Sequence, residues 1–454
     1  MAAASTAALI VAVGCGSGGN PDSSSATVTP AGQASIAKKH KRAANWPTYH
    51  ASLARTGIDT TSPGFSGLRR IWGQQFDGQV YAEPLVVGNR VYVATENNTI
   101  YALNAANGHV AWQRHLGTPV QGSTLPCGNI EPVTGITGTP AISGGTLYAV
   151  AFLSGYRHVL IGLSLRGGKV RMKRNIDAPG SDPRVHQQRP ALSVSKGRVY
   201  VAFGGLAGDC GDYKGRVVSV RARGKPAKRT FTVGVHREGA IWAPSGAAID
   251  RSGSLFVATG NGDATSGFDF GNSVIRLSPK LRQTGFYRAS NSAQLNAGDV
   301  DLGSVGPTLI GGNRMFVIGK EGLGLIVSTT HLGGTGGELF SQPVCGSGGA
   351  FGGLAYQSPV VYVPCTDGLH ALRVSGNSFS ESWRAGSSAG PPILAGGVVW
   401  SIDNGAVLHG YSPTTGGEVA NVDLGAVTHF PTPAAGGGRL FAPADSQVIA
   451  FAGI

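Results

Sequence analysis

The sequence predicts an all-β protein that folds as a single eight-bladed β-propeller of four-stranded antiparallel blades. Three observations lead to this prediction. The 454 residues include 72 glycines and 25 prolines, which break helices and favour tight turns. Hydrophobic residues make up 41% of the chain, which is too many for a disordered protein. Finally, one unit of short apolar strands and Gly-containing turns recurs along the chain, as it does in propellers.

The repeating unit is clearest between Pro84 and Trp112. Its strands are short and apolar, each turn between them contains Gly or Asn, and its last strand carries Trp112. Weaker copies begin near Pro140, Pro190, Pro244, Pro307, Gly353, Pro392 and Pro433. An apolar or aromatic pair recurs in the second strand of every copy, which indicates a repeated core position. Eight such sheets arranged radially would cover each other's apolar faces.

The two ends of the repeat region complete each other. The last copy ends at Val448–Phe451 and lacks an outer strand. The segment Leu68–Gly73, which precedes the first full copy, carries the Trp that is typical of that strand. We expect this N-terminal strand to close the ring in the last blade, because closure leaves no unpaired sheet edge there.

The N-terminal residues predict export and a lipid anchor. Residues 1–15 form a signal-like segment in which a short apolar run leads to a lipobox-like Cys15. The run is too short to span a bilayer, so a lipid on Cys15 would be the means of membrane attachment. Ordinary secretion and a cytoplasmic location are the alternatives. Residues 16–45 are expected to form a flexible polar and basic linker, and residues 46–454 the propeller.

The other four cysteines form an even set, which in an exported protein indicates disulfides. We expect a local bridge between Cys345 and Cys365, and a bridge between neighbouring blades from Cys127 to Cys210. A zinc site is the weaker alternative, because no CxxC or HxxxH spacing accompanies these cysteines.

The repeat resembles the PQQ-type repeat of the quinoprotein alcohol dehydrogenase-like superfamily, and also that of propeller lipoproteins of the bacterial envelope. The resemblance covers roughly residues 46–454 and extends beyond packing positions at three places. These are Gly239–Trp242 followed by Thr259–Gly262, Asp299–Leu302 ahead of Gly306-Pro307, and Gly319–Gly322.

The resemblance implies roles for four residues in these segments. Trp242 would lie under a quinone, Asn261 and Asp301 would bind calcium, Asp301 would also be the catalytic base, and Lys320 would reach the cofactor. These roles are chemically consistent. Calcium takes oxygen ligands, and a carboxylate can accept a hydroxyl proton. A flat quinone needs an aromatic ring on which to stack. The sequence establishes no cofactor, but it makes PQQ and calcium possible ones. Each residue also has a structural interpretation as a blade, turn or solvated hairpin residue.

The chain also departs from that superfamily's pattern. It has no adjacent cysteine pair to cover the cofactor, and it has no CxxCH motif for a covalent haem. The calcium-binding glutamate has no clear counterpart, although Asp209 and Asp212 lie in the expected region. His186 could be a ligand or a base, but a solvated loop histidine is the more common interpretation of such a residue.

Taken together, the sequence favours an exported binding or scaffold protein of the cell envelope that acts without turnover. Its ligand would be a protein, a polysaccharide or a small molecule held at the propeller face. The alternative is a PQQ- and calcium-dependent dehydrogenase of alcohols or sugars, and a hydrolase or lyase is a third class. The net charge is +13, but the basic residues beyond a cluster at 38–42 are scattered and lack interleaved aromatic residues. We therefore expect no nucleic-acid partner, and a monomer.

Overall fold

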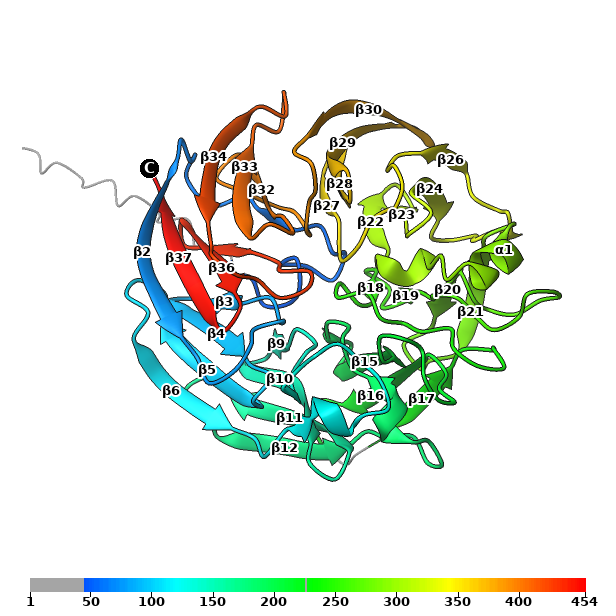
Figure 1. Cartoon of the computed structure of the whole chain (residues 1–454), viewed down its shortest axis with the longest axis horizontal. Coiled ribbons are helices and arrows are strands. Elements are labelled where there is room, and N and C mark those ends of the chain that lie inside the picture. The colour runs from blue at the N-terminus through cyan, green and yellow to red at the C-terminus, as the bar shows by residue number, and fades with distance from the viewer. Residues whose placement is uncertain (1–44, 225–226) are drawn as a thin grey trace, which may run out of the picture. The chain divides into compact units, whose positions relative to one another are not determined.

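The computed structural model describes residues 45–224 and 227–454, which form a ring of eight β-sheets (Figure 1). This confirms the predicted all-β propeller. Within the described residues the one α-helix is α1 (Ser292–Ala297), and no helix is long and apolar enough to cross a membrane. The predicted signal segment with Cys15, and the predicted linker up to residue 44, lie outside the described residues.

Blades are numbered here in chain order, with the innermost strand given first. Blades 1 to 4 consist of β3 (Leu85–Val87), β4 (Arg90–Ala94), β5 (Thr99–Asn104) and β6 (Val110–His115); β9 (Ala141–Ser143), β10 (Thr146–Leu153), β11 (Arg157–Ser164) and β12 (Val170–Asn175); β14 (Ser193–Ser195), β15 (Arg198–Gly205), β16 (Arg216–Arg221) and β17 (Arg229–Thr232); and β18 (Ala248–Ile249), β19 (Leu255–Ala258), β20 (Ser273–Leu277) and β21 (Gln283–Arg288).

Blades 5 to 8 consist of β22 (Thr308–Gly311), β23 (Arg314–Val317), β24 (Leu323–Ser328) and β26 (Phe340–Pro343); β27 (Ala355–Gln357), β28 (Val360–Cys365), β29 (Gly368–Ser375) and β30 (Ser378–Ala385); β31 (Ile393–Ala395), β32 (Val398–Ile402), β33 (Val407–Tyr411) and β34 (Glu418–Asp423); and β35 (Ala434–Gly436), β36 (Arg439–Ala444), β37 (Gln447–Gly453) and β2 (Leu68–Gln75).

Short elements decorate these blades. Blade 3 gains β13 (His186–Gln187), blade 4 gains β25 (Gly334–Thr335) and blade 7 gains β1 (Ile58–Asp59). The remaining elements are the pair β7 (Val120–Gln121) and β8 (Val133–Thr134), and the 3-10 helices η1 (Gly122–Thr124), η2 (Pro183–Val185) and η3 (Leu302–Ser304).

The repeated aromatic or apolar pairs lie in the core, as the sequence predicts. The aromatic member of each pair is buried in the second strand of its blade, with at most 4% of its surface exposed; these residues are Tyr92, Tyr148, Tyr200, Phe256, Phe316, Tyr362, Trp400 and Phe441. They pack within apolar clusters of buried side chains, and this burial stabilises the ring.

The ring closes as predicted, because the N-terminal strand β2 pairs antiparallel with β37. The register pairs Leu68 with Gly453 at one end and Gln75 with Gln447 at the other. Strands from the two ends of the chain therefore lie side by side in blade 8 (Figure 1).

In blades 8, 1 and 6, a tryptophan of the outer strand contacts the following blade. The indole of Trp112, in blade 1, donates to Leu165 O of blade 2 at 3.0 Å and lies against Gly168. Trp72 and Trp383 contact Gly108 and Gly416 of their following blades in the same way. All three glycines have positive φ, so glycine satisfies both the backbone conformation and the close approach of the ring.

Gly168→Ala should therefore destabilise the protein by about 1–3 kcal/mol. The new Cβ would lie 2.7 Å from Trp112 Cε3, on a residue whose φ is 64°. The neighbouring Gly167→Ala is a matched control, because nothing lies within 4 Å of its Cβ position. Chemical unfolding measures the free energy of unfolding of both variants. The control should stay within about 0.5 kcal/mol of the parent. Equal losses in the two variants would contradict this account of the blade contact.

A segment near the ring centre, Trp46–Asp59, touches every blade in turn; we call it the hub segment (Figure 1, blue). Its main chain bonds to the innermost strands of six blades, at Val86, Ile142, Ile249, Leu309, Tyr356 and Leu394. Its side chains reach Leu192 O in blade 3 and Thr432 before β35 in blade 8. The sequence did not predict this role, which ties together strands far apart in the chain.

Arg55 is the most heavily bonded residue of the hub segment. Its guanidinium is fully buried and donates to Ala247 O at 3.1 Å and to Ser193 Oγ at 2.7 Å, among five bonds in all. Burial lowers the pKa of Arg55 to about 10, although the charge of Glu83 opposes this change. The side chain therefore remains charged at neutral pH and holds blades 3 and 4 to the hub.

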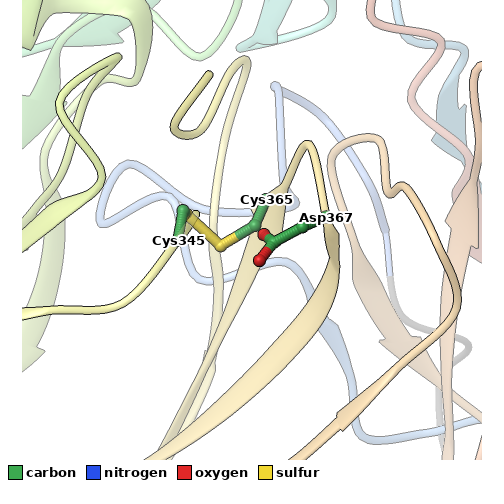
Figure 2. Close-up of side chains that lie close together, drawn as sticks. All are labelled: Cys345, Cys365 and Asp367. Carbon is green, nitrogen blue, oxygen red and sulfur yellow. A yellow bond between two sulfur atoms is a disulfide. The ribbon is translucent and has the colours of Figure 1, made fainter. Parts of the chain in front are cut away.

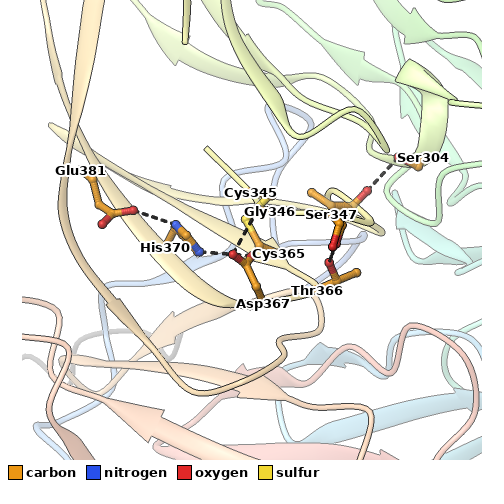
Figure 3. The surroundings of a disulfide bond; sticks show 10 residues. Ser304, Cys345, Gly346, Ser347, Cys365, Thr366, Asp367, His370 and Glu381 are labelled. Carbon is orange, nitrogen blue, oxygen red and sulfur yellow. Dashed lines mark hydrogen bonds and ion pairs between the residues drawn. A yellow bond between two sulfur atoms is a disulfide. The ribbon is translucent and has the colours of Figure 1, made fainter. Parts of the chain in front are cut away.

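Both predicted disulfides are present. Cys345 bonds to Cys365 with their Cα atoms 5.3 Å apart, and Asp367 lies beside them (Figure 2). The Asp367 carboxylate accepts from Gly346 N–H at 3.1 Å and faces His370, which binds Glu381 at 2.8 Å (Figure 3). Cys345, Cys365 and Asp367 are close enough to share a metal ion, but both sulfurs are bonded to each other and are not thiolate ligands.

Candidate functional site

A cavity of about 240 Å³ opens at the ends of strands of blades 3, 4 and 5. The four residues that the resemblance indicates, Trp242, Asn261, Asp301 and Lys320, all line it. They come from four separate connections, which follow β17, β19, α1 and β23. The fold thus brings together residues up to 78 positions apart, and their individual roles remain predictions.

Asp301 is the most constrained of the four. Its Oδ1 accepts from the backbone N–H of Asn261 at 2.7 Å, and its Oδ2 pairs with Lys320 Nζ at 2.7 Å. Gly260 makes room for this carboxylate, because a Cβ there would lie 2.3 Å from Asp301 Oδ1 and 3.4 Å from Trp242 Nε1. The carboxylate is therefore held in one orientation beside the indole.

The electrostatics of this pair suit a base. Burial raises the pKa of Asp301, while Lys320 and the Asn261 N–H oppose that rise. Partial burial disfavours the Lys320 charge, but pairing with Asp301 and Asp299 outweighs this and raises its pKa. Asp301 is thus more basic than an exposed aspartate, and Lys320 is a permanent cation beside it. Lys320 is half-buried in this pair and is not a solvated hairpin residue.

Glu238 completes the polar side of the site. Its Oε2 accepts from Asn261 Nδ2 at 2.9 Å, so one asparagine connects the carboxylates of Glu238 and Asp301. The sequence did not indicate Glu238, because the counterpart of the calcium-binding glutamate was expected near residues 209–212. Its place four residues before Trp242 was an available signal. Of the two aspartates considered, Asp209 lines the cavity and accepts from Tyr213, whereas Asp212 is exposed.

The donor set suits calcium. Glu238, Asn261 and Asp301 offer carboxylate and amide oxygens, the ligands that calcium prefers. Burial raises the pKa of Glu238; Arg237 opposes the rise, and the charges of Asp209, Asp263 and Asp299 add to it. A divalent cation would relieve the repulsion that these carboxylates exert on Glu238, so the residues present fit the ion.

The apolar side of the site suits a flat ring. Trp242 packs against Phe351 and Phe430 with ring centroids 6.3 and 6.2 Å away, and these two phenyl rings stack on each other. Lys320 Nζ lies 5.9 Å from the Trp242 centroid, and Arg189 lies 5.6 Å from that of Phe430. Aromatic faces flanked by two cations fit an anionic aromatic cofactor. The cavity is slightly smaller than the ~300–1,000 Å³ common for ligand pockets.

The Cys127–Cys210 disulfide lies behind the cavity wall. It joins the connection between blades 1 and 2 to the β15–β16 connection of blade 3, with Cα atoms 6.2 Å apart. A Cβ at Gly208, which lines the cavity, would lie 3.6 Å from Cys127 Sγ. The bridge therefore fixes the backbone of residues 208–209 at the cavity, without the adjacent cysteine pair of the superfamily.

His186 is not the solvated loop residue that the sequence favoured. It is buried in β13, its ring meets that of Tyr213 edge-on at 6.2 Å, and its Nδ1 bonds to Asp182 O at 2.8 Å. Burial, with a smaller contribution from Arg216, lowers its pKa to about 4. The imidazole is therefore neutral at physiological pH, and it does not line the cavity.

Comparison with known proteins gives similarity to two kinds of propeller. Residues 68–225 match the family model described as outer membrane protein assembly factor BamB. The chain is 24% identical over 355 residues to a polyvinylalcohol dehydrogenase of Pseudomonas sp. That match covers 67% of this chain but only 53% of the relative, so the chain spans about half of the relative's length.

Two solved structures illustrate the fold similarity. A quinohemoprotein alcohol dehydrogenase from Pseudomonas putida HK5 superposes with a TM-score of 0.71 at 14% identity, covering 90% of this chain and 80% of that one. BamB from Moraxella catarrhalis superposes with a TM-score of 0.56, also at 14% identity, covering 85% and 97%. At this identity the likeness concerns the fold, and it does not distinguish between a dehydrogenase and a binding protein.

Proposed function

We propose that this chain, a β-propeller of PQQ-type repeats, binds PQQ together with calcium and oxidises alcohols. The observation that supports this best is the convergence of Asn261, Asp301 and Lys320 on one cavity beside Trp242, with Glu238 bonded to the Asn261 side chain. The sequence alone ranked this function second, because neither the calcium glutamate nor the adjacent cysteine pair was recognisable. Glu238 offers a carboxylate beside Asn261, and this supports the proposal.

Each residue has a part that follows from its contacts. Glu238, Asn261 and Asp301 would hold the calcium ion through their oxygens, and Trp242 would support the cofactor ring. Asp301 accepts the proton of the substrate hydroxyl, because its pKa is raised and its carboxylate is oriented by Asn261 and Lys320. When bound, PQQ supplies the oxidant that takes up the two electrons removed from the alcohol carbon.

Protein incubated with PQQ and calcium should reduce an artificial electron-accepting dye when an alcohol is added. Turnover should fall as the pH drops through the pKa of the Asp301 carboxyl in the loaded protein, because the base must be deprotonated. The acid limb of a pH–rate profile measures this pKa. A loaded protein that gives no dye reduction with any primary, secondary or sugar alcohol would exclude this function.

A binding or scaffold role is the second candidate, supported by the BamB model match over residues 68–225. In that role the cavity and its loops would hold a protein, a polysaccharide or a small molecule without turnover. For either function we propose that the protein works outside the cytoplasm. The two disulfides support this, since such bonds persist mainly in oxidising compartments. Lipidation of Cys15 remains part of this proposal.

A further inference from the structure

A second depression lies at the opposite ends of the strands from the candidate site. It is a groove of about 640 Å³ formed by turns of blades 2, 3 and 4. Strand β15 connects the two places, because Arg198 at its start lines the groove and Gly205 at its end lines the cavity. At ~3.3 Å per residue, about 23 Å separates them. The groove is therefore distinct from the proposed quinone site.

Among the residues that the structure describes, the groove is lined by basic side chains and by no carboxylate. Its six cationic residues are Lys196, Arg198, Arg221, Arg223, Arg229 and Lys280. Within residues 45–224 and 227–454, none of the six forms an ion pair. The bonds that Arg198 and Arg223 make go to neutral oxygens, such as Ala227 O at 2.7 Å and Gly144 O at 3.1 Å.

These cations lie close enough to repel one another. Partial burial lowers the pKa of Arg198, and the charges of Arg229 and Arg221 lower it further. Five of the six residues are exposed, so their head groups remain accessible to a ligand. Because no carboxylate of the groove offsets this repulsion, a bound anion would stabilise the arrangement.

We propose that this groove binds a linear polymer that carries repeated phosphate groups. Four of its six cations are arginines, whose planar guanidinium groups bind phosphate oxygens in pairs. A polymer fits better than a single ion, because the cations come from turns and strand ends of two neighbouring blades and a lone phosphate contacts few of them.

The shape and lining of the groove disfavour other anionic partners. A bilayer surface is flat, whereas these cations line a depression. Single-stranded nucleic acids bind through exposed aromatic rings. The aromatic ring of this lining belongs to Tyr148, which is buried and donates to Ala222 O at 3.4 Å, so it offers no face for a base.

The test is a calorimetric titration of the full chain with inorganic polyphosphate of defined length, at low and at moderate salt. We expect binding that weakens as salt rises. The variant Arg221→Gln/Arg223→Gln/Arg229→Gln should bind roughly tenfold or more weakly, because half of the cationic contacts are lost. The pair Lys196→Gln/Lys280→Gln tests the same groove with different residues and should also weaken binding.

The matched control, Arg69→Gln/Arg70→Gln/Arg373→Gln, removes the same charge from exposed positions on blades 8 and 6. Its affinity for polyphosphate should be within about twofold of the parent's. All variants should have the melting temperature of the parent. Three results would overturn the proposal: no polyphosphate binding, equal losses in control and groove variants, or tighter binding to phosphatidylglycerol vesicles or single-stranded DNA than to polyphosphate. None of these results depends on whether the quinone site is active.

Discussion

Asp301→Asn is expected to lower alcohol turnover by about 10²–10⁴-fold while PQQ affinity changes little. The substitution keeps an oxygen that can contact calcium, but it removes the group that accepts the hydroxyl proton. It also removes the charge that pairs with Lys320 at 2.7 Å. The measurement is dye reduction by protein loaded with PQQ and calcium, with bound PQQ determined separately by absorbance.

The control for this variant is Asp299→Asn. Asp299 also binds Lys320, at 3.0 Å, but its side chain is largely exposed and makes no bond to the Asn261 backbone. It should retain most of the parent's turnover. If both variants lost activity equally, or if Asp301→Asn remained active, Asp301 would not be the base.

Removal of the hub segment and of β2 is expected to have the largest effect on stability. A chain that begins at residue 60 loses hydrogen bonds to all eight blades, and one that begins at residue 77 also loses the outer strand of blade 8. We expect the second chain to lose its cooperative melting transition or to self-associate, because it exposes the edge of β37. Differential scanning calorimetry and light scattering measure these outcomes.

A chain that begins at Asn45 is the control, since it retains every contact described above. It should melt with the full-length protein. The account of the hub segment would be wrong if the chain beginning at residue 60 melted within a few degrees of this control. Arg55→Met tests the same point without truncation, and it should cost about 3–5 kcal/mol because it leaves several buried acceptors without a donor and removes the positive charge that interacts with buried Glu83.

The propeller could be predicted because its signals repeat. The second-strand aromatics, such as Tyr92 and Tyr148, occupy equivalent buried places in successive blades, so the pattern in the chain reflects one packing position. Closure by Leu68–Gly73 followed from a missing strand at one end and a spare strand at the other. The disulfide pairs followed from position along these repeats.

Features without a repeating signal could not be predicted in the same way. The hub segment holds the blades mostly through main-chain bonds, which any sequence can make, so Trp46–Asp59 carries little pattern. Glu238 was missed because its contact with Asn261 depends on two loops that only the fold brings together. The groove was missed because cations scattered from Lys196 to Lys280 meet only when the turns of blades 3 and 4 are adjacent.

The most direct test of the proposed cofactor site is calorimetric titration of the protein with PQQ, with calcium and with a chelator. We predict micromolar or tighter binding in calcium and none in the chelator, because the carboxylates of PQQ and of the site repel until a cation lies between them. Trp242→Ala should weaken the calcium-dependent binding by about 1–3 kcal/mol, by analogy with aromatic stacking of bases. Absence of binding in calcium, or equal affinity in the chelator, would contradict the proposed site.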